Sequence, residues 1–472
     1  MFRARPRIGR AKQRFKEAQI TKQKKGNNML KVVKFGGSSC ADATQFAKVK
    51  SIVQSDPARR VVVVSAPGKR FKDDHKITDL LYLCAAHIKY GVSCEDIFNM
   101  IRGRYNDIAR DCRLSINLNE DFDALWERMK SGGISRDEIA SRGEYFSARL
   151  MAACLGFDFV DAALWVKFRF DGTVDQPASY EALRQAADGR GVVIPGFYGV
   201  MPDGHIRTFT RGGSDITGAL AAAALDADVY ENWTDVSGIL MADPRIVDNP
   251  APIRHVTYNE LRELSYVGAQ VLHEGAVYPV REKHIPLNIR NTNEPNHPGT
   301  LIMEKIEDED VEDDTFITGI AGKKGFSIIT VAKTSLSSEH GILLQIMEVL
   351  EKHLINVEFI LSGIDTVSLM VNADQVSKQL YEVLGELQKR LRPNSITVAE
   401  HIAIVAAVGR KMAYRLGTSG KLFATLGENG VNVRMITQGP DELNIIVGVE
   451  EKDFEQAIRV LYNSFVKEKT QA

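Results

Sequence analysis

Two glycine-rich segments that lie far apart in the chain carry side chains suited to binding phosphate and carboxylate groups. The first, residues 34–39 (KFGGSS), follows a short β-prone stretch. Glycines after a strand allow backbone N–H groups to approach phosphate oxygens, and the ammonium of Lys34 adds a compact positive charge. A Gly-Gly pair is more often an ordinary turn. The sequence has no P-loop pattern (GxxxxGKS/T), so this candidate phosphate site is of another kind.

The second segment, residues 208–215 (TFTRGGSD), runs into an Ala-rich stretch that we expect to be helical. A helix N-terminus attracts anions, and the guanidinium of Arg211 can bind a carboxylate through two hydrogen bonds. In the alternative interpretation, Ser214 or Asp215 only caps the helix.

Three shorter segments are weaker candidates. Residues 233–240 (WTDVSGIL) hold a Thr-Asp pair that suits nucleotide contacts, and Asp243-Pro244-Arg245 follows, where an ordinary turn is the alternative. Residues 142–147 (RGEYFS) place Glu144 in a predicted helix, where a carboxylate is more often solvated than functional. Residues 65–68 (SAPG) end a Val-rich run and can equally be a plain turn.

The elements around these segments indicate an α/β layered domain. We expect strands at Lys31–Phe35, Arg60–Ser65 and Val192–Ile194, and a helix from about Ala43 to Gln54. The run RVVVVS is apolar throughout, which is typical of a parallel strand buried on both faces. Residues 77–156 are mostly helical in pattern and would cover the sheet.

Composition narrows the classes of function. A chain of 472 residues predicts two or three domains, and its 44% hydrophobic and 26% charged residues are typical of a globular protein. No apolar run approaches the roughly 18 residues of a membrane span. Residues 1–28 hold ten Lys or Arg against one acid, which predicts a basic, disordered extension; the remainder is mildly acidic, against nucleic-acid binding. Five cysteines without a CxxC pair predict reduced thiols and a cytoplasmic protein.

The C-terminal third contains an internal repeat. Residues 304–314 hold eight acids against one Lys, which predicts a solvated linker over 301–315 after a first domain of residues 29–300. Beyond it the sequence matches itself at a shift of 76 residues, with Asn356-Val357 on Asn432-Val433 and Gly341 on Gly417. This predicts two βαββαβ units, residues 316–398 and 399–472, with a strand before the first unit that could belong to the second.

Together, the segments KFGGSS, VVSAPG, RGE, TRGGSD, WTDVSGI and DPR, in this order, resemble the aspartate kinases of the amino-acid kinase superfamily. The resemblance covers residues 30–472, and the repeat resembles that family's tandem ACT domains. It implies a three-layer α/β/α amino-acid kinase sandwich followed by two ferredoxin-like ACT domains. It also implies transfer of the ATP γ-phosphate to the β-carboxylate of L-aspartate, giving 4-phospho-L-aspartate, the first step toward lysine, threonine and methionine. Mg²⁺ would accompany ATP, and no residue is assigned as a metal ligand.

The resemblance also implies roles for individual residues. Lys34, Asp215 and Arg211 would be catalytic, with Arg211 on the α-carboxylate of aspartate. The aspartate pocket would be lined by Ser65, Thr78, Glu144, Phe197, Thr208 and Arg211. ATP would contact Lys34, Gly36, Gly37, Ser38, Ser39, Ser214, Thr234, Asp235 and Arg245. Two positions depart from the family pattern: Leu240 stands where some relatives carry Tyr, and Gln270 where many carry Lys, which puts the adenine side in doubt.

For the repeat, the resemblance implies feedback control by an amino acid, either lysine or threonine, and a homodimer or homotetramer formed through the ACT domains. The effector would contact Gly341, Ile342, Val357, Glu358 and Ser362. Glu358 could pair with the effector's ammonium, although a solvated strand residue is an equal alternative. Two other functions stay open: a related kinase acting on glutamate, acetylglutamate or a nucleotide, and an amino-acid-binding regulator with an inert kinase domain.

Overall fold

The computed structural model describes residues 29–187, 189–210, 212–269, 274–306, 317–410, 412, 415–439 and 443–467. The predicted extension at 1–28, Arg211 and Gln270 lie outside these residues. The described residues form two compact units: the first combines those within 29–239, 254–258 and 274–305, and the second combines those within 240–253, 259–269, 306 and 317–467. Two stretches that precede the repeat in sequence, within residues 240–253 and 259–269, therefore belong to the second unit.

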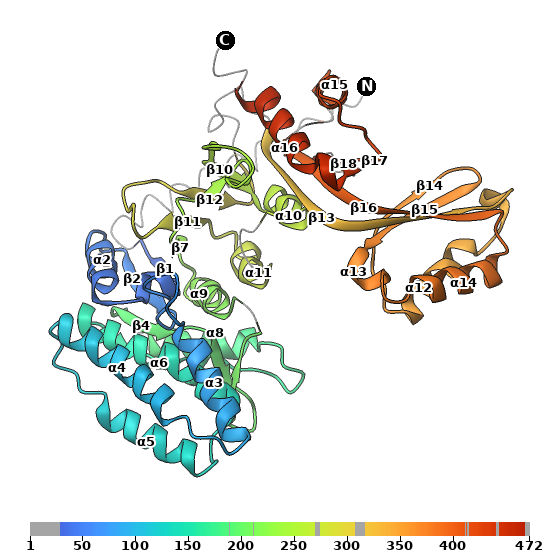
Figure 1. Cartoon of the computed structure of the whole chain (residues 1–472). Helices are drawn as coiled ribbons and strands as arrows, with labels where there is room; N and C mark the ends of the chain where they lie inside the picture. The colour runs from blue at the N-terminus through green and yellow to red at the C-terminus, as the bar shows by residue number, and fades with distance from the viewer. Residues whose placement is uncertain are drawn as a thin grey trace, which may run out of the picture. The chain divides into compact units, whose positions relative to one another are not determined.

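The first unit is built on an eight-stranded sheet with the strand order β10-β12-β11-β7-β1-β2-β4-β3 (Figure 1). Six neighbouring strands, from β11 to β3, are parallel, and β12 runs antiparallel to β11. The strands are β1 (Lys31–Phe35), β2 (Arg59–Val64), β3 (Asp158–Phe159), β4 (Val192–Pro195), β7 (Val229–Thr234), β10 (His255–Thr257), β11 (Leu287–Asn291) and β12 (Thr300–Met303). The expected strands near 31–35, 60–65 and 192–194 are confirmed.

Helices cover both faces of this sheet. One face packs against α2 (Ala43–Gln54), α3 (Ile77–Lys89), α4 (Glu95–Asp111), α5 (Asn119–Lys130) and α6 (Arg136–Leu155). The other face carries α9 (Gly213–Ala224), with α8 (Gln176–Ala186) and α11 (Glu274–Glu282) beside it. The short helix α7 (Ala162–Trp165) and the hairpin of β5 (Tyr198–Val200) and β6 (Ile206–Thr208) complete the unit. The three-layer α/β/α sandwich is confirmed.

Strand β1 shows how the two faces are specified. Val33 and Phe35 belong to the core beneath α2–α6. Because side chains alternate along a strand, Val32 and Lys34 point to the opposite face. There α9 approaches β7 so closely that a Cβ on Gly218 would lie 2.4 Å from the Tyr230 hydroxyl. A bulkier residue at 218 would push α9 away from the sheet, and with it the start of the helix that faces Lys34.

A buried ion cluster ties the parallel strands together. The carboxylate of Glu231 on β7 is 1% exposed and accepts two hydrogen bonds from Arg59, at 2.8 and 3.2 Å. It also lies 3.5 Å from the Lys31 ammonium and 3.7 Å from the Arg290 guanidinium. The indole N–H of Trp233 donates to it at 2.9 Å. One carboxylate thus links cations from β1, β2 and β11, of which Lys31 also pairs with Asp56 at 2.8 Å.

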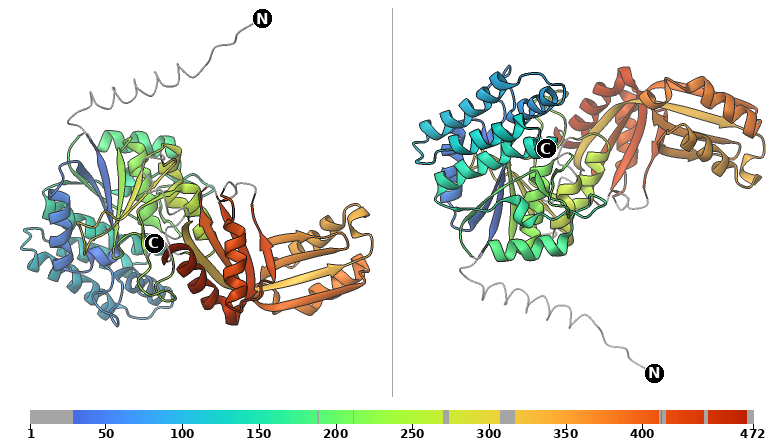
Figure 2. Two further views of the ribbon diagram at one scale, coloured as in Figure 1. Left: turned by 90° about the horizontal axis from the view of Figure 1, so that it is seen from above. Right: turned by 90° about the horizontal axis from the view of Figure 1, so that it is seen from below.

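The second unit contains a six-stranded antiparallel sheet with the order β14-β15-β13-β16-β18-β17. Its long strands are drawn in orange and red in Figure 2. Its strands are β13 (Ile317–Ala332), β14 (Val357–Ser362), β15 (Thr366–Asn372), β16 (Ser395–Gly409), β17 (Met435–Thr437) and β18 (Asn444–Glu450). Its helices are α12 (Ile342–Lys352), α13 (Ala373–Val376), α14 (Leu380–Leu391), α15 (Thr418–Glu428), α16 (Phe454–Tyr462) and, apart from its first residue, α10 (Tyr258–Tyr266). The short strands β8 (Ile239–Leu240) and β9 (Pro252–Ile253) pair with each other.

The 76-residue repeat has a structural counterpart. Helix α12 starts after Gly341 and α15 after Gly417, and both glycines have positive φ, 79° and 84°, a conformation that most residues with a side chain avoid. The long strands β13 and β16 pair over both halves: 317–323 pairs with 404–409, and 326–332 pairs with 395–402. The two repeats therefore share one continuous sheet.

Strand β12 continues the first unit's sheet to Met303, beyond the boundary expected at residue 300, and residues 307–315 of the expected linker lie outside the described residues. Within the described ranges, no helix is long and apolar enough to cross a membrane.

The ion cluster yields a stability prediction. Glu231→Gln removes the anion and leaves three partly or fully buried cations without it, so we expect a loss of about 3–5 kcal/mol of unfolding free energy. Urea unfolding followed by circular dichroism would measure it. Glu127→Gln, which removes an exposed partner of Lys130, is the matched control and should change stability by less than about 0.5 kcal/mol. Equal effects of the two substitutions would contradict the role given to Glu231.

Candidate active site

The candidate residues of the first unit gather where its parallel strands end. Phe35 on β1 is in register with Val64 on β2 and Trp233 on β7, and Val64 is in register with Pro195 on β4. The loops that follow these strands therefore begin side by side, at the carboxyl edge of the sheet. In open α/β sheets this carboxyl edge, where the strand order reverses on either side of β1, is the usual place for ligands.

Lys34 forms the centre of this edge. Its side chain is buried, and its Nζ lies 2.6 Å from Asp215 Oδ1 in α9 and 3.4 Å from Asn232 Oδ1 on β7. The Asn232 amide also donates to Asp215 Oδ1 at 3.0 Å, which closes a triangle of ammonium, carboxylate and amide. Lys34 and Asn232 are register partners across β1 and β7 and so share a face. The fold thus holds the ammonium of Lys34 in a fixed position at the carboxyl edge of the sheet.

The start of α9 does not use side-chain capping. The residue before the helix is Gly212, with φ of 60°, and no side chain caps the helix there. The capping alternative for Asp215 is therefore not adopted: its carboxylate pairs with Lys34, and Tyr230 donates a hydrogen bond to its backbone carbonyl. Ser214, a predicted ATP contact, is buried, and a Cβ on Gly196 would lie 2.6 Å from it.

The turn at Gly36–Ser39 is supported on three sides. Gly36 N–H donates to the Trp233 carbonyl at 3.0 Å, and Gly68 N–H donates to the Gly37 carbonyl at 2.8 Å. Added Cβ atoms would lie 3.0 Å from the Ala66 carbonyl at Gly37 and 2.7 Å from Gly37 at Gly68, so two backbones touch without side chains between them. The Ser39 hydroxyl lies 2.7 Å from that of Thr292, which follows β11. These contacts hold the backbone of the turn in one conformation, which a phosphate-binding turn requires.

Glu144 is buried in α6, not solvated. Gly143 packs against Ala66, and the backbone of Ala66 hydrogen-bonds the Glu144 carboxylate. Burial raises the pKa of Glu144 to about 8. Its Oε2 has no hydrogen-bond partner among the described residues. The neighbouring Cys40 thiol, near both Glu144 and Lys34, has its pKa raised to about 12 by burial. Glu144 is thus an unsatisfied acceptor suited to a cationic ligand group.

Four other predicted aspartate-pocket residues are partly exposed. Ser65 follows β2, Thr78 lies in the first turn of α3, Phe197 precedes β5, and Thr208 ends β6. Phe197 has a φ of 80°, and its N–H donates to Thr217 of α9 at 3.1 Å. Thr208 N–H donates to Asp137 of α6 at 3.0 Å, and its side chain hydrogen-bonds Tyr82 of α3. Contacts of these residues thus tie the hairpin to α9, α6 and α3, around the same edge.

The predicted nucleotide contacts are not all in one unit. Thr234 and Asp235 end β7, and the Thr234 hydroxyl donates to Asp235 at 3.1 Å. Arg245 belongs to the second unit, where it is exposed and pairs with Asp243 at 2.6 Å. The Asp243 carboxylate also accepts a hydrogen bond from the Arg245 backbone, as in the ordinary turn that the sequence left open. Leu240 is partly exposed in β8.

The predicted effector residues lie around the first repeat. Gly341 and Ile342 begin α12, and Val357, Glu358 and Ser362 lie on β14, the edge strand of the sheet. Glu358 is not simply solvated, because its carboxylate accepts a hydrogen bond from the Tyr266 hydroxyl at 2.7 Å. The Tyr266 ring also packs edge-on against Phe359, with the ring centres 5.9 Å apart.

Asn232 is a candidate site residue because it contacts both Lys34 and Asp215, and no motif in the sequence indicated it. The signal was an Asn in a buried strand, two residues before the Thr-Asp pair, where an uncharged polar side chain requires a partner.

Comparisons with known proteins agree with this geometry. Residues 29–291 match the amino acid kinase family, and residues 405–465 match an ACT domain. Aspartokinase 3 of Bacillus subtilis is 36% identical over 92% of this chain and 98% of its own length. The chain belongs to the aspartokinase family. It is an ATP-dependent aspartate kinase with an amino-acid kinase domain and C-terminal ACT domains.

Solved aspartokinases also share the fold. The aspartate kinase of Clostridium acetobutylicum is 44% identical, with a TM-score of 0.84 over 93% of this chain and all of its own. E. coli aspartokinase III, solved with aspartate and ADP, is 27% identical, with a TM-score of 0.70 over 92% of this chain and 99% of its own.

The buried Glu144 of this aspartokinase predicts a pH-dependent stability. Its pKa is about 8 in the folded protein against a usual 4.5, so its contribution to stability is complete below pH 4.5 and is lost as the pH rises toward 8. Glu144→Gln cannot ionise. Relative to the wild type, the variant should gain about 1.4 kcal/mol of unfolding free energy per pH unit across that window.

Thermal or urea unfolding at pH 5, 6 and 7.5 would measure this difference. Exposed Glu127→Gln is the control and should show no such trend. A stability difference between wild type and Glu144→Gln that stays constant with pH would contradict the neutral, buried carboxyl.

Proposed function

We propose that this aspartokinase transfers the γ-phosphoryl group of ATP to the β-carboxylate of L-aspartate and forms 4-phospho-L-aspartate, the first step toward lysine, threonine and methionine. The observation that carries the proposal is the triangle of Lys34, Asp215 and Asn232 beside the Gly36–Ser39 turn at the carboxyl edge. Phosphoryl transfer requires positioning and neutralisation of charge more than covalent catalysis, and a fixed ammonium beside a glycine turn supplies both.

In this proposal Lys34 stabilises the charge on the transferring group, while Asp215 and Asn232 hold its ammonium in place. Backbone N–H groups of Gly37 and Ser38, with Ser214 at the start of α9, would face the phosphates. Gly36 and Ser39 are also proposed as ATP contacts, but their N–H groups donate to the Trp233 and Gly36 carbonyls and shape the turn. Thr234 and Asp235 would contact the nucleotide from the end of β7, and Arg245 is proposed as a further nucleotide contact.

Mg²⁺ is proposed to arrive with ATP. The ion would be bound mainly by oxygens of the nucleotide phosphates, as Mg²⁺ usually is in kinases. Bound there, Mg²⁺ would neutralise the phosphate charge that otherwise repels the attacking carboxylate.

Aspartate has two carboxylates and an ammonium, and the candidate residues offer a match for these groups. The Glu144 carboxyl, whose Oε2 has no partner among the described residues, would accept a hydrogen bond from the α-ammonium of aspartate. Arg211 would bind the α-carboxylate. Ser65, Thr78, Phe197 and Thr208 would line the remaining wall. The structure of E. coli aspartokinase III with aspartate and ADP supports a site of this kind.

Trapping of the acyl phosphate with hydroxylamine tests the reaction. We expect product only with ATP, Mg²⁺ and aspartate, and not with glutamate or acetylglutamate. Lys34→Ala and Arg211→Ala should each lower kcat/KM by on the order of 10² or more. The first removes the charge proposed to stabilise the transferring group, and the second removes the proposed partner of the α-carboxylate of aspartate. Lys130→Ala, at an exposed lysine of α5, is the control. If either site variant turned over at the wild-type rate, the role proposed for the substituted residue would be wrong.

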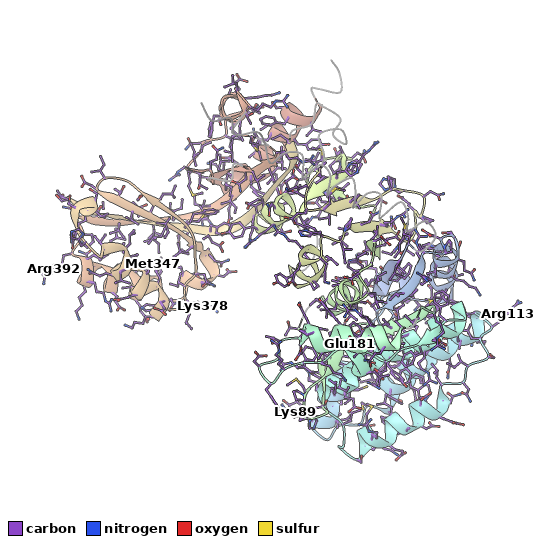
Figure 3. The ribbon with its side chains drawn as sticks, turned by 180° about the vertical axis from the view of Figure 1, so that it is seen from behind. Lys89, Arg113, Glu181, Met347, Lys378 and Arg392 are labelled. Carbon is purple, nitrogen blue, oxygen red and sulfur yellow. The ribbon has the colours of Figure 1, made fainter. Side chains whose placement is uncertain are left out.

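We also propose that lysine or threonine regulates the enzyme through the ACT repeats. Gly341, Ile342, Val357, Glu358 and Ser362 would hold the effector, with Glu358 on its ammonium. E. coli aspartokinase III has been solved with lysine and aspartate, which supports amino-acid control in the family. Assembly into a homodimer or homotetramer is proposed to use the same repeats: Leu344, Met347 and Ile360 are partly exposed apolar side chains of α12 and β14, and Met347 lies on the helical side of the sheet (Figure 3).

The hydrogen bond from Tyr266 to Glu358 predicts an effect on this regulation. An effector ammonium must compete with the Tyr266 hydroxyl for the carboxylate, so Tyr266→Phe should lower the half-inhibitory effector concentration by about 2–10-fold. Activity without effector should not change. Steady-state assays with lysine and with threonine would measure it, with the exposed Tyr381→Phe as control. An unchanged inhibition curve for Tyr266→Phe would rule out the competition.

A further inference from the structure

We propose that Arg104 of α4 is a positioning residue for phosphoryl transfer, because it fixes the phosphate turn and the loop after β2 to each other. It lies outside all the segments that the sequence singled out. Its side chain is 7% exposed, which is rare for an arginine and requires full pairing. This inference rests on the proposed role of the Gly36–Ser39 turn.

The guanidinium of Arg104 contacts both loops. Its Nη1 donates to the Gly68 carbonyl at 3.2 Å and to the Ala41 carbonyl at 3.5 Å. Ala41 directly follows the turn and the short 3₁₀ segment Gly37–Cys40, and Gly68 is the residue whose N–H donates to Gly37. One planar group therefore spans the two backbones that touch at Gly37 and Gly68.

The other edge of the guanidinium is anchored by Asp74. Nη2 lies 2.9 Å from both oxygens of this buried carboxylate. Asp74 also accepts hydrogen bonds from the side chain and backbone N–H of Arg70, and these bonds, with the nearby Arg104 charge, hold its pKa well below the usual range. Asp74 is therefore ionised at all working pH values and keeps the loop between β2 and α3 folded onto Arg104.

This loop leads directly into α3, whose first turn carries Thr78. Ile77 N–H donates to the Pro67 carbonyl at 3.1 Å, so a displacement of the loop also moves the start of α3. Arg104 thus has no contact with the proposed reacting groups but determines the spacing between the phosphate turn and one wall of the proposed aspartate pocket. A lysine cannot replace it, because one ammonium cannot bond two carbonyls and a bidentate carboxylate in a plane.

The test compares Arg104→Lys, Asp74→Asn and the double variant with Arg110→Lys, a control on the exposed face of the same helix. Misplacement of a reactive geometry by about 1 Å costs on the order of 10²-fold in rate, so we expect kcat per folded molecule to fall about 10–100-fold in both single variants. The double variant should be no worse than the more damaged single variant, since both act through one contact. Arg110→Lys should match the wild type.

Circular dichroism and the binding of ATP, followed by calorimetry, separate positioning from folding. A native spectrum with ATP still bound and a lowered kcat supports the proposal. Unchanged kcat and KM in Arg104→Lys would overturn it, and so would a loss of activity that only follows the unfolded fraction or independent, multiplying effects of the two substitutions. Lys34→Ala, measured in parallel, shows whether the proposed catalytic site itself has failed.

Discussion

The carboxyl edge of the first unit's sheet depends on holding the buried ammonium of Lys34 in one place. Lys34 is 7% exposed, and burial of a cation without a paired anion carries a large desolvation cost. The Asp215 carboxylate at 2.6 Å offsets this cost, but only because α9 begins at Gly212 without a side-chain cap and packs tightly on Tyr230. The small residues of α9 are therefore needed to place the Asp215 carboxylate beside Lys34. The position of α9, the register of the strands and the pairing of the two charges depend on one another.

Local patterns predicted most of the fold. The strand Lys31–Phe35 and the helix Ala43–Gln54 have the bounds expected from the sequence, because a Val-rich run between turns and an amphipathic stretch leave few alternatives. The 76-residue shift anticipated the alignment of α12 with α15, since both repeats need a glycine with positive φ before the helix. These features depend on neighbours in sequence, and so the sequence alone reveals them.

Contacts between distant residues were not predictable in the same way. Asn232 acquires its role only because β7 pairs with β1, 198 residues away in the chain. Glu144 looked like a solvated helix residue, and only the packing of Gly143 on Ala66 shows that it is buried. The Tyr266 hydroxyl and Glu358 are 92 residues apart and carry no shared motif. Each case requires the register or packing of elements that a single sequence does not specify.

The division of the chain assigns most of helix α10 to the same unit as the ACT repeats. Helix α10 lies within the region that matches the amino acid kinase family, yet most of it packs with the ACT repeats. Its Glu260 is buried and accepts hydrogen bonds from Thr318 of β13 and Arg410 beyond β16, while Tyr266 at its other end bonds Glu358. An effector changes activity only if it binds two arrangements unequally. Because β13 and β16 run through both repeats, α10 is held at both ends by a sheet that the two repeats share.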